Sequence, residues 1–276
     1  MLFIAMINEK RGINMDTKLI FFDIDGTLLD EKTFTVPTSA KKALQLAKDN
    51  GHHCFINTGR TRCILDPVIC SLPFDGYICG CGTYIEYLGQ EIYHHHLTEE
   101  NRQKIIEMAI DCHVDCVMEG KEGIYFPKTI RHTFVQTIFK RYKELHFPIY
   151  RYTKEDLFRF DKMALWYDDQ SDIEKFKQFI SMDFDIIQRD IDFIEIVPHT
   201  CSKATGIQKI ADYLHLSIDH TISIGDSTND LPMLTFTKES VAMGNSNPLL
   251  FDKVSYITTD INNDGIYNAL KHYKLI

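Results

Sequence analysis

Unbroken apolar runs alternate along this chain with segments whose apolar residues recur at helical intervals. The first run extends from Lys18 to Phe22 and the second from His53 to Asn57, and between them Thr38 to Asn50 carries alanines and leucines along one helical face. Strands that are apolar at every position are buried on both faces, as in a parallel sheet covered by helices. The alternation therefore predicts βαβ units and an α/β fold.

The same pattern continues to about residue 97 and returns after Pro198. The early part predicts a helix over Thr61 to Leu72, a short strand at Tyr77 to Cys79 and a hairpin at Tyr84 to His95. The late part predicts helices at Lys203 to Leu214, near Asn229 and at Asp264 to Tyr273, and strands at Thr221 to Ile224, Val241 to Met243 and Tyr256 to Ile257. We expect the last two strands at the edge of the sheet.

Between Thr98 and Val197 the order of elements changes. This stretch predicts helices at Thr98 to His113, Ile130 to Lys143 and Asp172 to Ile180, two short strands around Gly123, a strand at Met163 to Tyr167 and two further strands. About 100 residues of this kind are enough for a small α+β domain. We predict that residues 98–197 form a domain inserted into an α/β core, which comprises residues 1–97 and 198–276. Residues 1–14 are predicted to be a dispensable extension.

Charge and composition narrow the class of partner. The formal net charge is −9, and binding to nucleic acid or to an anionic membrane rewards clustered Lys and Arg instead. No stretch approaches the roughly 18 consecutive apolar residues of a membrane-spanning helix, and the first residues lack the basic region of a secretory signal. Eight cysteines without an export signal are expected to be reduced thiols rather than disulfides or zinc ligands. We expect a cytoplasmic monomer that binds neither nucleic acid nor membrane.

Two carboxylates follow the most apolar strand of the chain. The stretch LIFFDIDGTLLD places Asp23 and Asp25 directly after it, and burying two like charges is costly unless they are neutralised. Asp226 follows another predicted strand, and the carboxyl ends of parallel strands share one edge of a sheet. A magnesium ion held by Asp23 and Asp226 would offset the repulsion and neutralise phosphate charge. Asp23 could then attack phosphorus, and Asp25 could serve as acid and base.

Groups that can bind phosphate are predicted at the same edge. Thr58 and the backbone N–H of Gly59 follow the strand that ends at Asn57, beside the start of a helix. Lys203 offers a point charge to the nucleophile and to the phosphate. Asn229 can donate to phosphate, and Asp230 can orient Lys203 or a metal-bound water.

Together these stretches resemble the haloacid dehalogenase (HAD) superfamily. DIDGTLLD, NTGR, the segment around Lys203 and GDSTND match its four motifs in order, and the chain from Met15 onward resembles Cof-type phosphatases. The resemblance implies a Rossmann-like core with a parallel sheet, and a C2-type α+β cap between the second and third motifs. It implies that Asp23 is the nucleophile and Asp25 the acid and base. The implied metal ligands are Asp23, Asp226 and the backbone carbonyl of Asp25, and the implied phosphate ligands are Thr58, Gly59, Lys203 and Asn229.

The expected function is that of a Mg2+-dependent phosphatase acting through an aspartyl-phosphate intermediate. Its expected substrates are small phosphorylated metabolites: sugar phosphates, or flavin mononucleotide or pyridoxal phosphate. Two alternatives use the same residues. One is a sugar phosphomutase that returns the phosphoryl group to a bound sugar phosphate. The other is a catalytically silent protein that binds a phosphorylated metabolite.

Three features lie outside the four motifs. The stretch GYICGCGTYIE has Cys79, Gly80 and Cys81 where the family often has a small residue and Asn before the Gly. The run His94 to His96 cannot place all three rings on one ion, because neighbouring side chains of a strand alternate between faces. A polar hairpin edge is expected there. The sole tryptophan, Trp166, is expected in the core of the inserted domain.

Overall fold

The computed structural model describes residue 14 and residues 16–276, which form two compact units. The first unit contains the residues up to Gly59, Asp66–Tyr93 and Ser202–Ile276, and the second contains Arg60–Leu65 and His94–Cys201. The predicted extension at residues 1–14 lies outside the described residues, apart from Asn14. The predicted boundaries at 97/98 and 197/198 stay predictions, and the compact units meet along the chain a few residues from both positions.

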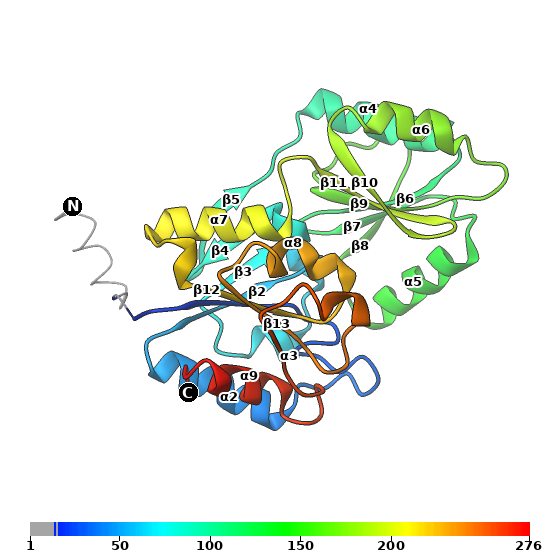
Figure 1. The fold of residues 1–276 in the computed structure, drawn as a ribbon. Coiled ribbons are helices and arrows are strands. Elements are labelled where there is room, and N and C mark those ends of the chain that lie inside the picture. The colour runs from blue at the N-terminus through cyan, green and yellow to red at the C-terminus, as the bar shows by residue number, and fades with distance from the viewer. Residues whose placement is uncertain (1–13, 15) are drawn as a thin grey trace. The chain divides into compact units, whose positions relative to one another are not determined.

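An eight-stranded sheet forms the centre of the first unit (Figure 1). Its order is β14-β13-β12-β1-β2-β3-β4-β5. The strands are β1 (Leu19–Phe22), β2 (His53–Asn57), β3 (Gly76–Cys79), β4 (Tyr84–Tyr87), β5 (Gln90–His94), β12 (Thr221–Gly225), β13 (Glu239–Ala242) and β14 (Tyr256–Ile257). Neighbouring strands from β14 to β3 pair in parallel, and β4 pairs antiparallel with β3. The carboxyl ends of β1, β2 and β12 therefore meet at one edge, where the strand order reverses on either side of β1.

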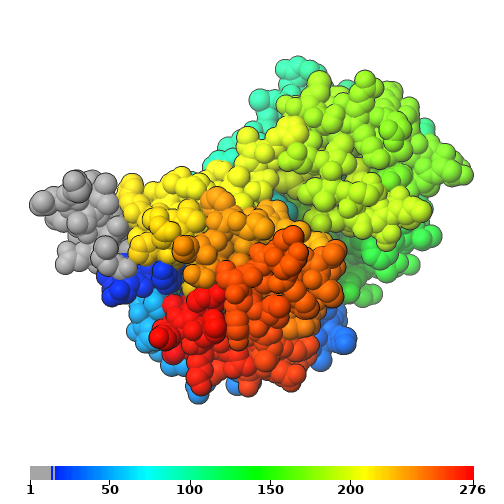
Figure 2. Space-filling view, viewed as in Figure 1, coloured from blue at the N-terminus to red at the C-terminus, as the bar shows by residue number. Residues whose placement is uncertain are grey.

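Helices cover both faces of this sheet, which explains why β1 is apolar and buried at every position. Figure 1 shows α2 (Thr38–Asp49) and α9 (Gly265–His272) on one face and α7 (Lys203–Leu214) on the other. Phe21 and Phe55 pack on the α7 side with Ile207 and Ile210. The segment after β12, coloured orange to red, forms much of the visible surface of this unit (Figure 2). It includes α8 (Leu231–Leu234).

The second unit contains a six-stranded sheet in the order β10-β11-β9-β6-β7-β8. Its elements are α4 (Glu99–Asp111), β6 (Asp115–Glu119), β7 (Ile124–Pro127), α5 (Thr133–Glu144), β8 (Ile149–Tyr152), β9 (Lys162–Trp166), α6 (Ile173–Ile180), β10 (Phe184–Asp190) and β11 (Phe193–Pro198). All pairings are antiparallel except that of β7 with β8. The predicted fold class is confirmed: a parallel α/β core and an α+β second unit.

Both faces of the second sheet are covered, and alternate residues of β9 point to opposite faces. Met163 and Leu165 pack with α4 and α6. Ala164 and Trp166 lie on the other face, in a cluster that includes Val135 of α5. The Trp166 ring stacks on another aromatic ring with centroids 4.3 Å apart, and the residue is 6% exposed. The prediction that Trp166 belongs to this core is confirmed.

Three predictions about elements were wrong. The helix predicted over Thr61 to Leu72 is a short 3₁₀ turn, Arg62–Ile64, followed by α3 (Pro67–Cys70). Proline at position 67 disfavours helical backbone in the residue before it and has no N–H to donate, so the helix cannot run through. The strand β8 was not predicted. Finally, β13 is not an edge strand, because it pairs with β12 on one side and β14 on the other. Among the described residues, no helix is long and apolar enough to cross a membrane.

A group of charged side chains lies buried or half-buried in the second unit. Lys162 is 4% exposed, and its Nζ lies 2.8 Å from Oε1 of Glu195 and 3.5 Å from Oε2 of Glu119. Arg189 Nη2 lies 2.5 Å from the other oxygen of Glu195. Burial alone would raise the pKa of Glu195, but the two cations outweigh it and lower this pKa to about 2. The anion of Glu195 is therefore favoured in the folded state.

Replacing Glu195 by Gln should lower the free energy of unfolding at pH 7 on the order of 3 kcal/mol, the value of this pKa shift. A depressed pKa gives stability above the unfolded value of 4.5, and this stability is lost as the pH falls toward about 2. Chemical denaturation of both proteins at several pH values checks this. The control is Glu174→Gln, because Glu174 is 84% exposed and pairs only loosely, at 3.6 Å, with Lys177. Equal losses in the two variants would contradict the prediction.

Candidate active site

Four of the sequence-predicted residues lie at the carboxyl edge of the first unit's sheet. Asp23 follows β1, Thr58 follows β2 and Asp226 follows β12, and β1 pairs directly with both of the other strands. Lys203 is the first residue of α7 and reaches the same edge with its side chain, which is 2% exposed. The parallel sheet thus brings together residues that are far apart in the sequence, such as Asp23 and Asp226.

The ammonium of Lys203 lies between two carboxylates. Its Nζ is 2.5 Å from Oδ1 of Asp23 and 2.5 Å from Oδ1 of Asp230, and both acids are buried. Burial alone would lower the pKa of Lys203, but the two anions raise it above its ordinary value. A cation at a helix start is disfavoured by the helix dipole, and here the two carboxylates outweigh that effect. Ser202 holds the helix start in place through a reciprocal capping box with Thr205.

Asp230 connects this lysine to the loop that carries Asp226. Its Oδ2 accepts hydrogen bonds from the backbone N–H groups of Asp226, at 3.0 Å, and Ser227, at 3.1 Å. Its Oδ1 accepts from Lys203. One fully buried carboxylate therefore holds the loop after β12 and the lysine of α7 in a common arrangement. The orientation of Lys203 by Asp230 during catalysis stays a prediction.

The turn after β1 packs directly against Asp226. Thr27 donates its hydroxyl to Oδ1 of Asp226 at 3.0 Å. Gly26 has φ of +74°, and a Cβ placed there would lie 2.3 Å from Oδ2 of Asp226. The position therefore requires a residue that tolerates positive φ and has no side chain. Asp25 lies in the same turn, half-buried.

Asp23, Asp226 and Asp230 form a group that could hold a metal ion. One carboxylate oxygen from each lies within 4.8 Å of the others. Burial and the charge of Asp230 raise the pKa of Asp23 to about 8 and that of Asp226 to about 7. With all groups ionised, three carboxylates and the ammonium of Lys203 leave two negative charges uncompensated. Oxygen donors with this charge suit a hard divalent cation.

The predicted metal ligands are Asp23, Asp226 and the backbone carbonyl of Asp25, and Asp230 was expected to orient Lys203 instead. The two oxygens of Asp230 already accept hydrogen bonds from Lys203 and from two backbone N–H groups. Asp23 and Asp226 are common to both sets, and each has its own place at the end of a strand. The donor set therefore fits a cation held mainly by these two residues.

The loop after β2 is held from both sides by backbone hydrogen bonds. Thr58 donates its N–H to the carbonyl of Ile78 at 2.9 Å, and Cys81 donates its N–H to the carbonyl of Thr58 at 3.0 Å. A Cβ on Gly59 would lie 3.6 Å from Sγ of Cys81. The stretch that departs from the family pattern therefore lies directly beside the predicted phosphate-binding residues.

Two asparagines that were not predicted also support the site. Asn57 is fully buried and donates to the backbone carbonyl of Lys203 at 3.0 Å. Asn245 donates to the carbonyl of Gly26 at 2.8 Å and accepts from the N–H of Ile261. Asn57 ends a strand within the quoted stretch NTGR, and Asn245 follows β13. Their place at the carboxyl ends of strands is the signal that could have identified them.

Asn229 lies in the short turn between Asp226 and α8, half-buried, and its side-chain oxygen accepts a hydrogen bond from the hydroxyl of Ser227. The histidine run lies elsewhere. His94 Nε2 lies 2.7 Å from Oδ1 of Asp161, and its ring contacts that of His96 at 4.6 Å between centroids. The contact between alternate residues of the run agrees with the expected alternation of faces.

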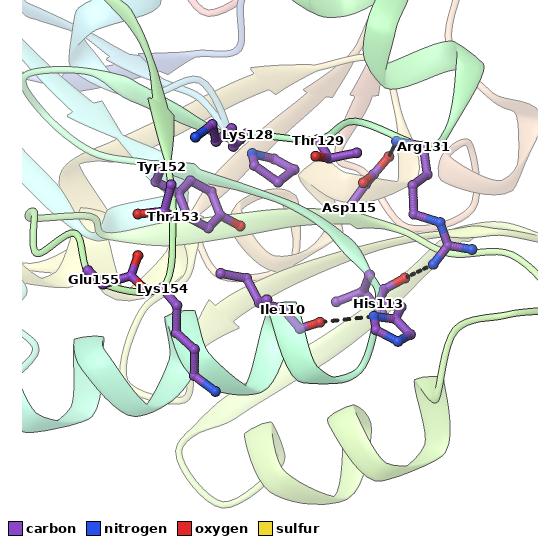
Figure 3. A pocket seen from close by; sticks show the side chains of 12 residues that line it. Ile110, His113, Asp115, Lys128, Thr129, Arg131, Tyr152, Thr153, Lys154 and Glu155 are labelled. Carbon is purple, nitrogen blue, oxygen red and sulfur yellow. Dashed lines mark hydrogen bonds between the residues drawn. The ribbon is translucent and has the colours of Figure 1, made fainter.

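A separate pocket of about 440 Å³ lies within the second unit (Figure 3). None of the three clustered carboxylates lines it. Arg131 donates to both oxygens of Asp168 at 2.9 Å and to the carbonyl of His113 at 3.1 Å. Figure 3 draws the hydrogen bond to His113 as a dashed line. Lys154 pairs with Asp111 at 2.9 Å. These cations therefore pair with groups of the second unit itself.

Replacing Gly26 by Ala should reduce kcat/KM at least about 10²-fold, because the new methyl group must displace the carboxylate of Asp226. The matched control is Gly51→Ala. Gly51 has φ of +82° but nothing within 4 Å of its added Cβ, so this variant carries the backbone strain without the displacement. Steady-state kinetics on both variants separates the two effects. Equal activities would show that Gly26 does not position Asp226.

Comparison with known proteins places the chain in a family. The model of haloacid dehalogenase-like hydrolases matches residues 20–270. The putative phosphatase YkrA of Bacillus subtilis is 29% identical over 274 residues, which cover 95% of this chain and all of YkrA. The 5-amino-6-(5-phospho-D-ribitylamino)uracil phosphatase YitU of the same organism is 27% identical over 283 residues, covering 94% of this chain and 99% of YitU.

A solved structure gives the same result for the fold. It is that of the HAD subclass IIB sugar phosphatase BT4131, which is 27% identical and superimposes with a TM-score of 0.77. The match covers 94% of this chain and all of that protein. Sequence and fold therefore agree over nearly the full length. The chain belongs to the haloacid dehalogenase-like hydrolase family and, within it, to the phosphatases of the Cof type.

Proposed function

We propose that this phosphatase hydrolyses small phosphomonoesters with Asp23 as the nucleophile and Mg2+ as the cofactor. The observation that carries the proposal is the position of Lys203, whose Nζ lies 2.5 Å from Asp23 and from Asp230. The buried ammonium of Lys203 acts to lower the pKa of Asp23 against the larger effect of burial, and it places a positive charge where phosphate oxygens would approach. Asp226 beside them supplies the second strand-end carboxylate.

Hydrolysis would proceed in two displacements at phosphorus. In the first, an oxygen of Asp23 forms a bond to phosphorus while the bond to the ester oxygen breaks, and Asp25 gives its proton to that leaving oxygen. In the second, Asp25 takes a proton from water as the water oxygen attacks phosphorus. The bond to Asp23 then breaks and inorganic phosphate leaves. Both carboxyl groups return to their starting states.

Mg2+ would be held by Asp23, Asp226 and the backbone carbonyl of Asp25, with Asp230 orienting Lys203. When bound, the ion would neutralise part of the phosphate charge and offset the repulsion between the carboxylates. The phosphate itself would be bound by Thr58, Gly59, Lys203 and Asn229. The first two offer a hydroxyl and a backbone N–H from the loop after β2, and the others offer an ammonium and a side-chain amide.

The proposed substrates are small sugar phosphates and related phosphorylated metabolites. Two relatives support this class by their names, since one is a sugar phosphatase and the other is a 5-amino-6-(5-phospho-D-ribitylamino)uracil phosphatase. Flavin mononucleotide and pyridoxal phosphate belong in the same substrate panel. We also propose that the protein is cytoplasmic, because all eight cysteines are thiols without a disulfide, as is usual in a reducing compartment. We propose a monomer, because a single chain supplies every proposed site residue.

Phosphate release from this panel should require both Mg2+ and Asp23. Asp23→Asn should lower kcat at least about 10³-fold, because the amide cannot serve as the nucleophile. Removal of divalent cations by a chelator should have a comparable effect that added Mg2+ reverses. The matched control is Asp212→Asn, since Asp212 is exposed on the same helix as Lys203 and its side chain accepts a hydrogen bond from Gln208. Its activity should equal that of the wild type.

Three outcomes would contradict the proposal. Labelled phosphate that appears on an isomer of the substrate, and not in solution, would indicate a phosphomutase. Tight binding of a phosphorylated metabolite by folded, magnesium-loaded wild type without turnover would indicate a binding protein. Activity that survives in Asp23→Asn would assign the nucleophile to another residue.

A further inference from the structure

The loop that carries Thr58 and Gly59 continues directly into a segment that belongs to the other unit. Residues up to Gly59 pack in the first unit, whereas Arg60–Leu65 packs in the second. The chain then returns to the first unit at Asp66. A short piece of the core sequence is thus built into the inserted unit, immediately next to the proposed phosphate-binding residues.

The far end of this segment is anchored in the apolar core of the second unit. Ile64 is 5% exposed and belongs to one cluster of buried side chains. The members of this cluster are Ile64, Val117, Ile124, Phe126, Val135, Ala164 and Trp166. Next to it, Cys63 donates its thiol to the backbone carbonyl of Gly120 at 3.2 Å. Both contacts lie inside the second unit.

The segment is short and folded into a turn. Its residues form a 3₁₀ turn, Arg62–Ile64, in which the N–H of Ile64 donates to the carbonyl of Thr61 at 3.1 Å. Thr61 is 1% exposed. At the other end, Thr58 is held by two backbone hydrogen bonds in the first unit. Only Gly59 and Arg60 separate the held residue of one unit from the held turn of the other.

We infer that Cys63 and Ile64 are positioning residues for phosphate binding, because they anchor the loop of Thr58 and Gly59 to the core of the second unit. The inference rests on the proposed function, in which that loop binds phosphate. Packing at Ile64 then selects the backbone conformation in which the N–H of Gly59 and the hydroxyl of Thr58 meet the phosphate oxygens. Loosening this anchor should weaken phosphate binding even though Ile64 does not touch the ligand.

The test compares two identical deletions in the same cluster. Ile64→Ala and Ile124→Ala each remove the same atoms from buried isoleucines, which are 5% and 0% exposed, but only Ile64 lies on the segment. The inhibition constant of inorganic phosphate, measured against a hydrolysed ester with Mg2+ present, should rise about fivefold or more in Ile64→Ala. It should change less than about twofold in Ile124→Ala. Ile64→Val, which keeps most of the packing, should restore the wild-type constant.

A second measurement does not depend on turnover. Trp166 belongs to the same cluster and is the sole tryptophan, so its fluorescence reports on that core. Inorganic phosphate added with Mg2+ should change the emission of wild type and of Ile124→Ala, and the change should be lost in Ile64→Ala. Should Ile64→Ala not fold, Cys63→Ala replaces it, because this variant removes the thiol that bonds to Gly120 and contacts the hydroxyl of Thr61. Its inhibition constant should rise at least about twofold.

The outcomes separate this inference from the proposed function. If wild type releases no phosphate from any ester, the proposed function fails. If wild type hydrolyses esters but Ile64→Ala and Ile124→Ala have equal inhibition constants at equal losses of stability, the inference alone is overturned. The same conclusion follows if both variants keep the fluorescence change.

Discussion

The ion pairs of Lys203 with Asp23 and Asp230 are the constraint on which the rest of the site depends. Burying three charged groups is costly unless each finds a partner, and here one ammonium serves two carboxylates. The arrangement requires three distant parts of the chain to meet at one point: the end of β1, the start of α7 and the turn before α8. The parallel sheet provides that point because its strand order reverses around β1. The remaining negative charge makes the same place suitable for a divalent cation.

The second unit is organised around a different sheet, and more than two stretches of the chain connect it to the first unit. The chain passes between the units at four places, and two of them adjoin residues of the site. One lies at Gly59 and the other at Ser202, which caps the helix of Lys203. Two of the crossings thus lie next to predicted phosphate ligands along the chain.

Element by element, the sequence predicts best where packing and local preference agree. The strand over Leu19–Phe22 and the helix over Thr38–Asp49 are found as expected, because a continuous apolar run and a helical apolar face have only one way to be buried. The helix predicted at Thr61 to Leu72 failed because Pro67 interrupts it and because part of the segment packs in the other unit. The strand at Ile149–Tyr152 was missed because half of its residues are exposed and its partner β7 is recognised only in the folded sheet.

The sequence by itself determined the α/β class, and it predicted the inserted unit and the candidate site residues, because these follow from periodicity and from polar groups placed at the ends of apolar strands. Tertiary structure alone decided how those groups are paired. Three features depend on distances between segments far apart in the chain. Asp230 holds both Lys203 and the backbone at Asp226, position 26 has no room for a side chain, and Asn245 supports the turn after β1. One sequence carries no record of such distances, since they arise only when the strands are aligned in a sheet.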